Sequence, residues 1–243
     1  LEALGARTDE DPGDPKPGWL HGVAPGAEAP PTVVCRRVRL NVDSDMPRVL
    51  IAGHLDTVHD PRGDFRELSI NPDGKTAVGP GCVDMKGGLV IAVAALEVLE
   101  EVGVDSSWSF FLNSDEETGT YHSTARLTAE SQKHEFGIAL EPALPGGELA
   151  IERMGAGQFM VETRGRSAHV GRAFTDGISA VTKLAECLVK IGEMPDPERG
   201  LILNVGPLQG GPVVNAVPDL ARAWGNVRFP SQKESDEIAA MLD

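Results

Sequence analysis

"DMKGGLVIAVAALEVLEEVGVDSSWSFFLN", residues 84–113, joins a long apolar stretch to a run of aromatic and aliphatic residues. The first part predicts a helix over 84–103, which Gly103 ends, and the second predicts a strand over 107–113. Strands are also expected at 48–54 and 136–140, on either side of these elements. The alternation predicts an α/β fold with a mostly parallel central sheet and helices on both faces.

The flanking segments complete this first domain. Residues 8–31 are rich in Pro, Gly and acidic residues and predict an irregular loop, whereas 32–40 predict a strand. "NPDG" at 71–74 predicts the turn of a short hairpin, and a helix is expected over about 121–133. We assign residues 1–152 to part of a catalytic domain.

The pattern changes after about residue 150, where strand, helix, strand, strand and helix follow in order. The predicted elements are 157–165, 176–192, 201–209, 219–229 and 234–242. This order is typical of a small α+β domain of the split βαβ type. We therefore expect a second, incomplete domain over 153–243.

Composition excludes several classes of protein. The net charge of −15 argues against nucleic-acid binding and against binding to an anionic membrane. The longest apolar run, 89–96, is too short to span a bilayer. Three widely spaced cysteines form no disulfide framework and favour a reducing, cytoplasmic compartment.

Polar residues follow each of the three central strands. His54 and Asp56 come after the first, Glu116 and Glu117 after the second, and Glu141 after the third. Open α/β sheets bind ligands beyond the carboxyl ends of their strands. Each stretch taken alone could be a solvated loop, but three together favour one site.

Asp84 could simply cap the helix that follows it. A carboxylate there could also bridge two metal ions in a hydrolytic site, and imidazole with carboxylates suits Zn²⁺, with Co²⁺ or Mn²⁺ as substitutes. Because Glu116 and Glu117 are adjacent, one could bind metal while the other faces the substrate as general base. Asp56 fits the role of holding the imidazole of His54.

Six motifs occur in an order that resembles the di-zinc aminoacylase and carboxypeptidase family: "GHLDTV", "GPGCVDMKGG", "SDEETG", "ALEP", "GRSAHVG" and "NAVPD". The family includes acetylornithine deacetylase, succinyl-diaminopimelate desuccinylase and the carboxypeptidase G type, which is nearest. The resemblance spans roughly residues 32–230. It implies a metallohydrolase that cleaves an amide bond beside a carboxylate.

The resemblance also implies individual roles. His54 and Glu141 would bind one zinc, Asp84 would bridge, and Glu117 would bind the second. Glu116 would be the general base. Further residues would act from the small domain: His169 on the oxyanion, often across a homodimer, and Asn215 and Arg228 on the substrate's carboxylate.

The family's last metal-binding histidine would follow residue 243. We therefore expect this chain to hold at most one metal firmly and not to turn over substrate efficiently. The alternative to an enzyme is a catalytically incomplete relative or fragment that retains the fold for ligand binding or dimerisation. Glu141 in "EP" implies a carboxypeptidase or deacylase, because aminopeptidases of the family carry Asp there.

Overall fold

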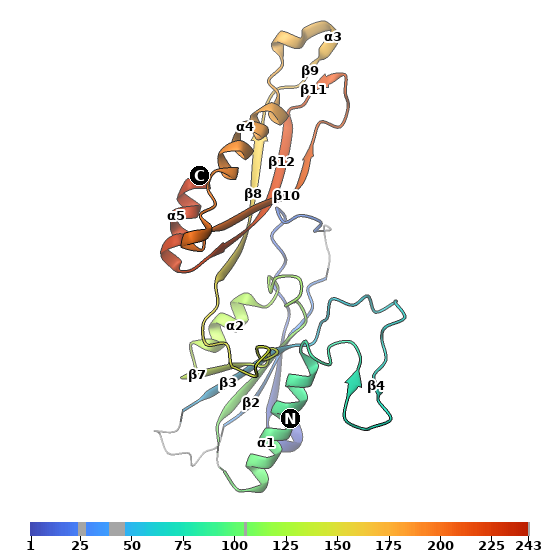
Figure 1. Ribbon diagram of the computed structural model, residues 1–243, viewed down its shortest axis with the longest axis vertical. Helices are drawn as coiled ribbons and strands as arrows, with labels where there is room; N and C mark the ends of the chain where they lie inside the picture. Colours follow the sequence, from blue (N-terminus) through green and yellow to red (C-terminus); the bar gives the residue numbers. More distant parts are fainter. Residues whose placement is uncertain (24–27, 39–46, 105, 243) are drawn as a thin grey trace. The chain divides into compact units, whose positions relative to one another are not determined.

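The computed structural model describes residues 1–23, 28–38, 47–104 and 106–242 (Figure 1). The chain folds into two compact units. Unit 1 comprises Leu1–Pro17 and Pro25–Leu149, and unit 2 comprises Gly18–Ala24 and Ala150–Asp243.

Unit 1 is built on a five-stranded sheet with the strand order β1-β2-β6-β3-β7. Its strands are β1 (Arg7–Asp11), β2 (Thr32–Arg37), β3 (Val49–His54), β6 (Trp108–Asn113) and β7 (Phe136–Ala139). The pairings of β3 with β6 and with β7 are parallel, whereas β1 with β2 and β2 with β6 are antiparallel. The predicted α/β fold is confirmed, and its sheet is mixed.

Successive side chains of a strand point to opposite faces, so the apolar strands of this sheet present apolar side chains on both faces. Helices cover both faces. Ile51 and Phe110 pack with Leu89 of α1 (Lys86–Glu101) on one face. Leu50 and Phe111 pack with Leu127 of α2 (Thr124–Ser131) on the other.

The prediction of an irregular loop from residue 8 is wrong for β1. This acidic edge strand pairs with β2 and is stabilised by ion pairs. Arg126 donates to Asp9 at 2.5 Å and also to Asp11, and Arg36 donates to Asp9 at 3.3 Å. Partners that are distant in the sequence cannot be predicted from local composition. Residues 39–40 of the predicted strand lie outside the described residues.

Between β3 and α1 the chain makes a long excursion that contains the predicted hairpin. Its strands are β4 (Ser69–Ile70) and β5 (Ala77–Val78), which pair antiparallel. Figure 1 shows this excursion reaching away from the sheet. A short 3-10 turn, η1 (Glu2–Leu4), starts the chain.

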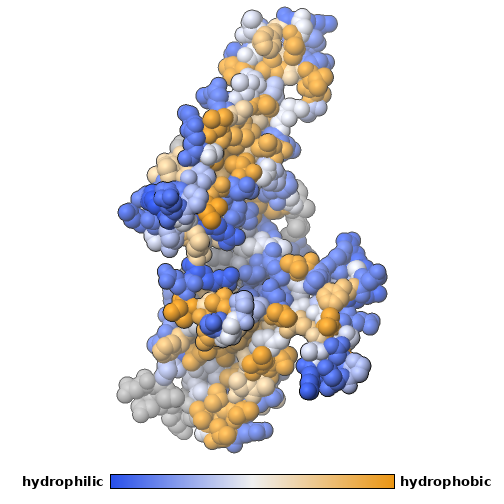
Figure 2. Space-filling view, viewed as in Figure 1, coloured by the Kyte–Doolittle hydropathy of each residue, from blue (hydrophilic) through white to orange (hydrophobic). Residues whose placement is uncertain are grey.

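The outer side of α1 stays apolar and exposed. Val90, Ile91 and Val98 are exposed, although Leu89 and Leu96 on the same helix are buried. Figure 2 shows apolar side chains on this part of the surface. None of the helices within the described ranges is long and apolar enough to cross a membrane.

Unit 2 holds a three-stranded antiparallel sheet with two helices on one face. The sheet has the order β10-β12-β8, with β8 (Gly155–Arg164), β10 (Ile202–Gly210) and β12 (Leu220–Phe229). The helices are α4 (Ala180–Gly192) and α5 (Gln232–Leu242). Ile191 of α4 and Ile238 of α5 share a core with Val227 of β12.

Helix α4 begins four residues later than predicted. The Ser179 side chain accepts a hydrogen bond from the Thr182 amide at 3.1 Å and so caps the helix. The remaining elements are short: β9 (Ala168–His169), α3 (Val170–Ala173), η2 (Phe174–Asp176), η3 (Pro197–Arg199) and β11 (Ala216–Val217).

Candidate metal centre

The carboxyl ends of three parallel strands meet at one edge of the unit 1 sheet. His54, the last residue of β3, lies beside Asn113, the last residue of β6. On the other side of β3, the Leu140 amide donates to the Ala52 carbonyl at 3.0 Å. The chain segments that carry the predicted acidic residues therefore leave the sheet next to one another.

Three of the predicted metal ligands come together here. The Nε2 atom of His54 lies 3.1 Å from Asp84 Oδ1 and 3.9 Å from Glu141 Oε1. One ligand atom from each of these residues lies within 4.8 Å of the other two. The His54 side chain is buried, whereas Asp84 remains 55% exposed and open to an approaching ligand.

Two glycines allow the chain to approach this closely. A Cβ atom on Gly53 would lie 2.6 Å from Leu89 Cδ2 and 2.7 Å from Met85 Cε. A Cβ on Gly88 would lie 2.2 Å from the carbonyl oxygen of Leu140. Larger residues would push the start of α1 away from β3 and from the segment before Glu141, so Gly53 and Gly88 shape the site.

Asp56 connects His54 to the segment that carries the adjacent glutamates. The His54 Nδ1 atom lies 3.0 Å from the Asp56 carbonyl oxygen and 3.4 Å from Asp56 Oδ1. The Asp56 carboxylate also accepts hydrogen bonds from the amides of Glu116 at 3.3 Å and Glu117 at 3.0 Å. Asp56 thus contacts both the imidazole, mainly through its backbone carbonyl, and the turn at 116–117, through its carboxylate.

Asp115 is not among the predicted site residues, yet its side chain holds the start of this turn in place. Its buried carboxylate accepts hydrogen bonds from Ser123 Oγ at 2.6 Å, Asn113 Nδ2 at 3.1 Å and the His122 amide at 2.7 Å. The motif "SDEETG" offered three carboxylates, and only burial distinguishes the anchoring one. Glu117 lies outside the ligand triad and lines a hollow together with Asp84.

The electrostatics of the site favour a cation. Burial raises the pKa of Glu116; His54 opposes this rise, and Glu117, Asp56 and Asp84 add to it. Burial likewise raises the pKa of Glu141. His54 lowers this pKa, whereas Asp84 and Glu116 raise it further. Carboxylates that repel one another this way are stabilised by a bound cation.

The pKa of His54 is also raised. Burial opposes the charged imidazole, but the hydrogen bonds with the Asp56 carbonyl and Asp84, together with the charges of Asp56 and Glu141, outweigh it. These same contacts leave Nε2 directed at the carboxylates. One imidazole nitrogen and two carboxylates are a donor set that Zn²⁺ accepts, so the residues present fit such an ion.

The residues predicted in the small domain fall into two groups within unit 2. His169 pairs in register with Ala216, and the Val170 amide donates to the Asn215 carbonyl at 3.0 Å, so His169 and Asn215 are neighbours. Arg228 is exposed near the far end of β12. From Leu220, at the near end, to Arg228 the strand extends about 26 Å.

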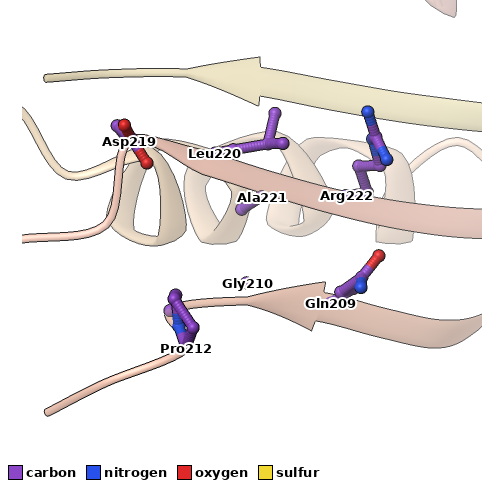
Figure 3. Close-up of a pocket in the computed structure, with 8 residues that line it drawn as sticks. Gln209, Gly210, Pro212, Asp219, Leu220, Ala221 and Arg222 are labelled. Atoms are coloured by element: carbon purple, nitrogen blue, oxygen red, sulfur yellow. The ribbon is translucent and has the colours of Figure 1, made fainter. Parts of the chain in front are cut away.

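A second hollow lies in unit 2, between the ends of β10 and β12 (Figure 3). It measures about 380 Å³ and is lined by Gly210, Pro212, Asp219 and Arg222, among others. Arg222 donates to Glu162 at 2.7 Å. The hollow contains none of the predicted metal or substrate residues, so we assign it no chemistry.

Comparison with known proteins confirms the predicted relationship. Residues 151–243 match the peptidase dimerisation domain family, M20_dimer. The chain is 26% identical over 198 residues to carboxypeptidase G2 from Pseudomonas sp. strain RS-16, covering 80% of this chain and 48% of that protein. It is 28% identical over 219 residues to succinyl-diaminopimelate desuccinylase 2 from Shewanella loihica, covering 82% and 58%.

Solved structures share the fold. Aminopeptidase PepT from Bacillus cereus superposes with a TM-score of 0.67 at 24% identity, covering 99% of this chain and 61% of that one. An M20 family metallo-carboxypeptidase from Sulfolobus solfataricus gives 0.60 at 16% identity, covering 99% and 67%. The chain thus has the fold of these peptidases, and its residues 151–243 match the peptidase dimerisation domain. It spans about half the length of the carboxypeptidases it matches.

Proposed function

We propose that the protein carrying this chain is a zinc-dependent hydrolase of an amide bond adjacent to a carboxylate, of the carboxypeptidase or N-acyl amino acid deacylase type. The observation that carries this proposal is the cluster of His54, Asp84 and Glu141 at the carboxyl edge of the sheet. The names of the relatives, carboxypeptidase and desuccinylase, support it.

His54, Asp84 and Glu141 would hold one zinc, and Asp84 would share a second with Glu117. Cobalt or manganese could substitute, since both accept nitrogen and oxygen ligands. When bound, zinc supplies Lewis-acid polarisation of the scissile carbonyl and lowers the pKa of water. These assignments extend the ligand cluster by one residue, Glu117, which shares a hollow with Asp84.

Glu116 would act as the general base. It would take the proton from the attacking water and deliver it to the leaving amine. Its carboxyl group is within electrostatic range of His54 and Asp84, and its backbone is held by Asp56. Holding the base in place before substrate binds is what general-base catalysis requires.

In this proposal, unit 1 belongs to the catalytic domain, and unit 2 is a lid that also forms a homodimer. His169 and Asn215 lie next to the start of β12, and Arg228 lies near its other end, about 26 Å along the strand. One copy of unit 2 therefore cannot bring all three to one small substrate. A dimer resolves this, because one subunit can supply Arg228 and its partner His169. The guanidinium of Arg228 suits a free carboxylate.

Replacing Glu116 tests this proposal directly. In the protein that carries the chain, supplied with zinc, Glu116→Gln should lower the hydrolysis of N-acyl amino acids by about 10²–10⁴-fold. Zinc content should stay the same, because only Glu117 of the pair is assigned to metal. Glu148→Gln, at an exposed position of unit 1, is the matched control. Near-normal turnover of the Glu116→Gln variant would rule out this role.

A further inference from the structure

A hollow of about 350 Å³ adjoins the metal centre within unit 1. Its walls come mainly from the excursion between β3 and α1, including Val78 of β5. Asp84 and Glu117 are part of its lining, and Asp84 also contacts His54. A group bound in the hollow would therefore be directly connected to the place where the scissile bond would lie.

Most of the other side chains that line the hollow are apolar. Val58, Phe65, Val78 and Val83 line it, and their exposed fractions are 75%, 44%, 50% and 72%. The ring of His59 packs edge-on against Phe65, with 4.8 Å between centroids. Exposed apolar side chains that gather around one concavity mark a binding site for an apolar group.

The lining favours an uncharged group over an anionic one. All twelve lining residues belong to the described part of the chain, and none of them is Lys or Arg. The charged residues among them are the carboxylates Asp84 and Glu117. A free carboxylate bound among the apolar side chains of this lining would lose its hydration without a Lys or Arg to pair with. The carboxylate of the substrate must therefore bind elsewhere.

We propose that this hollow is the acyl-side subsite and that it selects substrates with an uncharged, apolar acyl group, aliphatic or phenyl, over a succinyl group. The inference rests on the proposed function, which supplies the carboxylate on the leaving amino acid. Val78 and Phe65 are specificity-determining residues that would contact the acyl chain. A cavity of this volume accommodates a branched aliphatic or phenyl group.

The first test measures binding without turnover. Phenylacetamide, an uncharged probe with the phenyl group of such a substrate, is titrated into the zinc-loaded protein and followed by ligand-observed saturation-transfer NMR. We expect saturation transfer to phenylacetamide and none to succinamate, the charged analogue. Val78→Asp should abolish the signal. Ile70→Asp, on the paired strand and 66% exposed but outside the lining, should retain it.

Phe65→Asp provides a second variant in case Val78→Asp does not fold. Equal binding of phenylacetamide to the unmodified protein and to a folded Val78→Asp or Phe65→Asp variant would overturn the inference. So would binding of succinamate as strong as that of phenylacetamide.

The second test measures kcat/KM for phenylacetyl and succinyl derivatives of the same amino acid. We expect a preference for phenylacetyl of about tenfold or more, reduced at least tenfold by Val78→Asp. Hydrolysis with a succinyl preference would overturn this inference and leave the proposed function intact. Loss of all hydrolysis, with phenylacetamide still bound in the hollow, would instead refute the proposed function.

Discussion

Asp115→Ala should loosen the turn that carries both adjacent glutamates. The substitution removes a buried carboxylate that accepts three hydrogen bonds and leaves the donors of Asn113, His122 and Ser123 without it. Each buried donor left unsatisfied costs about 1–3 kcal/mol, and such costs are not additive. We expect unit 1 to lose about 3–5 kcal/mol of unfolding free energy.

Hydrogen exchange followed by mass spectrometry resolves this effect by unit. A loss of 3 kcal/mol corresponds to roughly 150-fold faster exchange for amides that open only with the unit, such as those of β6. Strand β12 in unit 2 is the internal control. Asp73→Ala, at an exposed turn, should change exchange in β6 by less than about threefold. Unchanged exchange in β6 of the Asp115→Ala variant would refute the reasoning.

Three further predictions concern pH, packing and assembly. Burial opposes ionisation of Glu130, but hydrogen bonds, led by the one from Arg36, lower its pKa, so this carboxylate stabilises unit 1 at neutral pH. The stabilisation should fade as the pH falls below about 4.5. Glu130→Gln should therefore flatten that part of an acid-unfolding curve measured by circular dichroism. Gly88→Ala places a methyl group 2.2 Å from the Leu140 carbonyl oxygen and should weaken zinc binding measured by calorimetry at least tenfold, and an unchanged affinity would show that the close approach is dispensable. Leu208→Asp, at an exposed position of the edge strand β10, should convert the proposed homodimer to a monomer in light scattering, and an undisturbed dimer would place the interface elsewhere.

Much of the fold follows from local patterns that the final structure keeps. The apolar runs at β3 and β6 are buried on both faces, and such strands are recognisable without knowledge of their partners. The helix α1 is recognisable from its long apolar run and from Gly103, which follows it. Strand β1 is different, because its acidic residues do not favour a strand by themselves and are paired with Arg126 from a distant helix. A contact between residues so far apart in the sequence cannot be predicted from local sequence patterns.

The candidate site shows a similar division. Placement of His54, Asp84 and Glu141 in one cluster could be predicted, since all three lie at ends of elements that a parallel arrangement brings to one edge. The anchoring role of Asp115 could not, because adjacent carboxylates look alike until their burial is known. The separation of Arg228 from His169 depends on the pairing of β9 with β11 next to the start of β12, which sequence patterns leave open.

Zinc binding by Glu141→Gln tests the central claim most directly. We predict that the unmodified chain, stripped of metal and dialysed, takes up zinc in a calorimetric titration. Glu141→Gln should weaken this binding at least tenfold. Glu148→Gln, at an exposed position in the same segment, should leave the binding unchanged. The amide is close in size to the carboxylate, so the fold should be retained. Zinc affinity that is equal in the unmodified chain and in the Glu141→Gln variant would contradict the assignment of His54, Asp84 and Glu141 as the metal site.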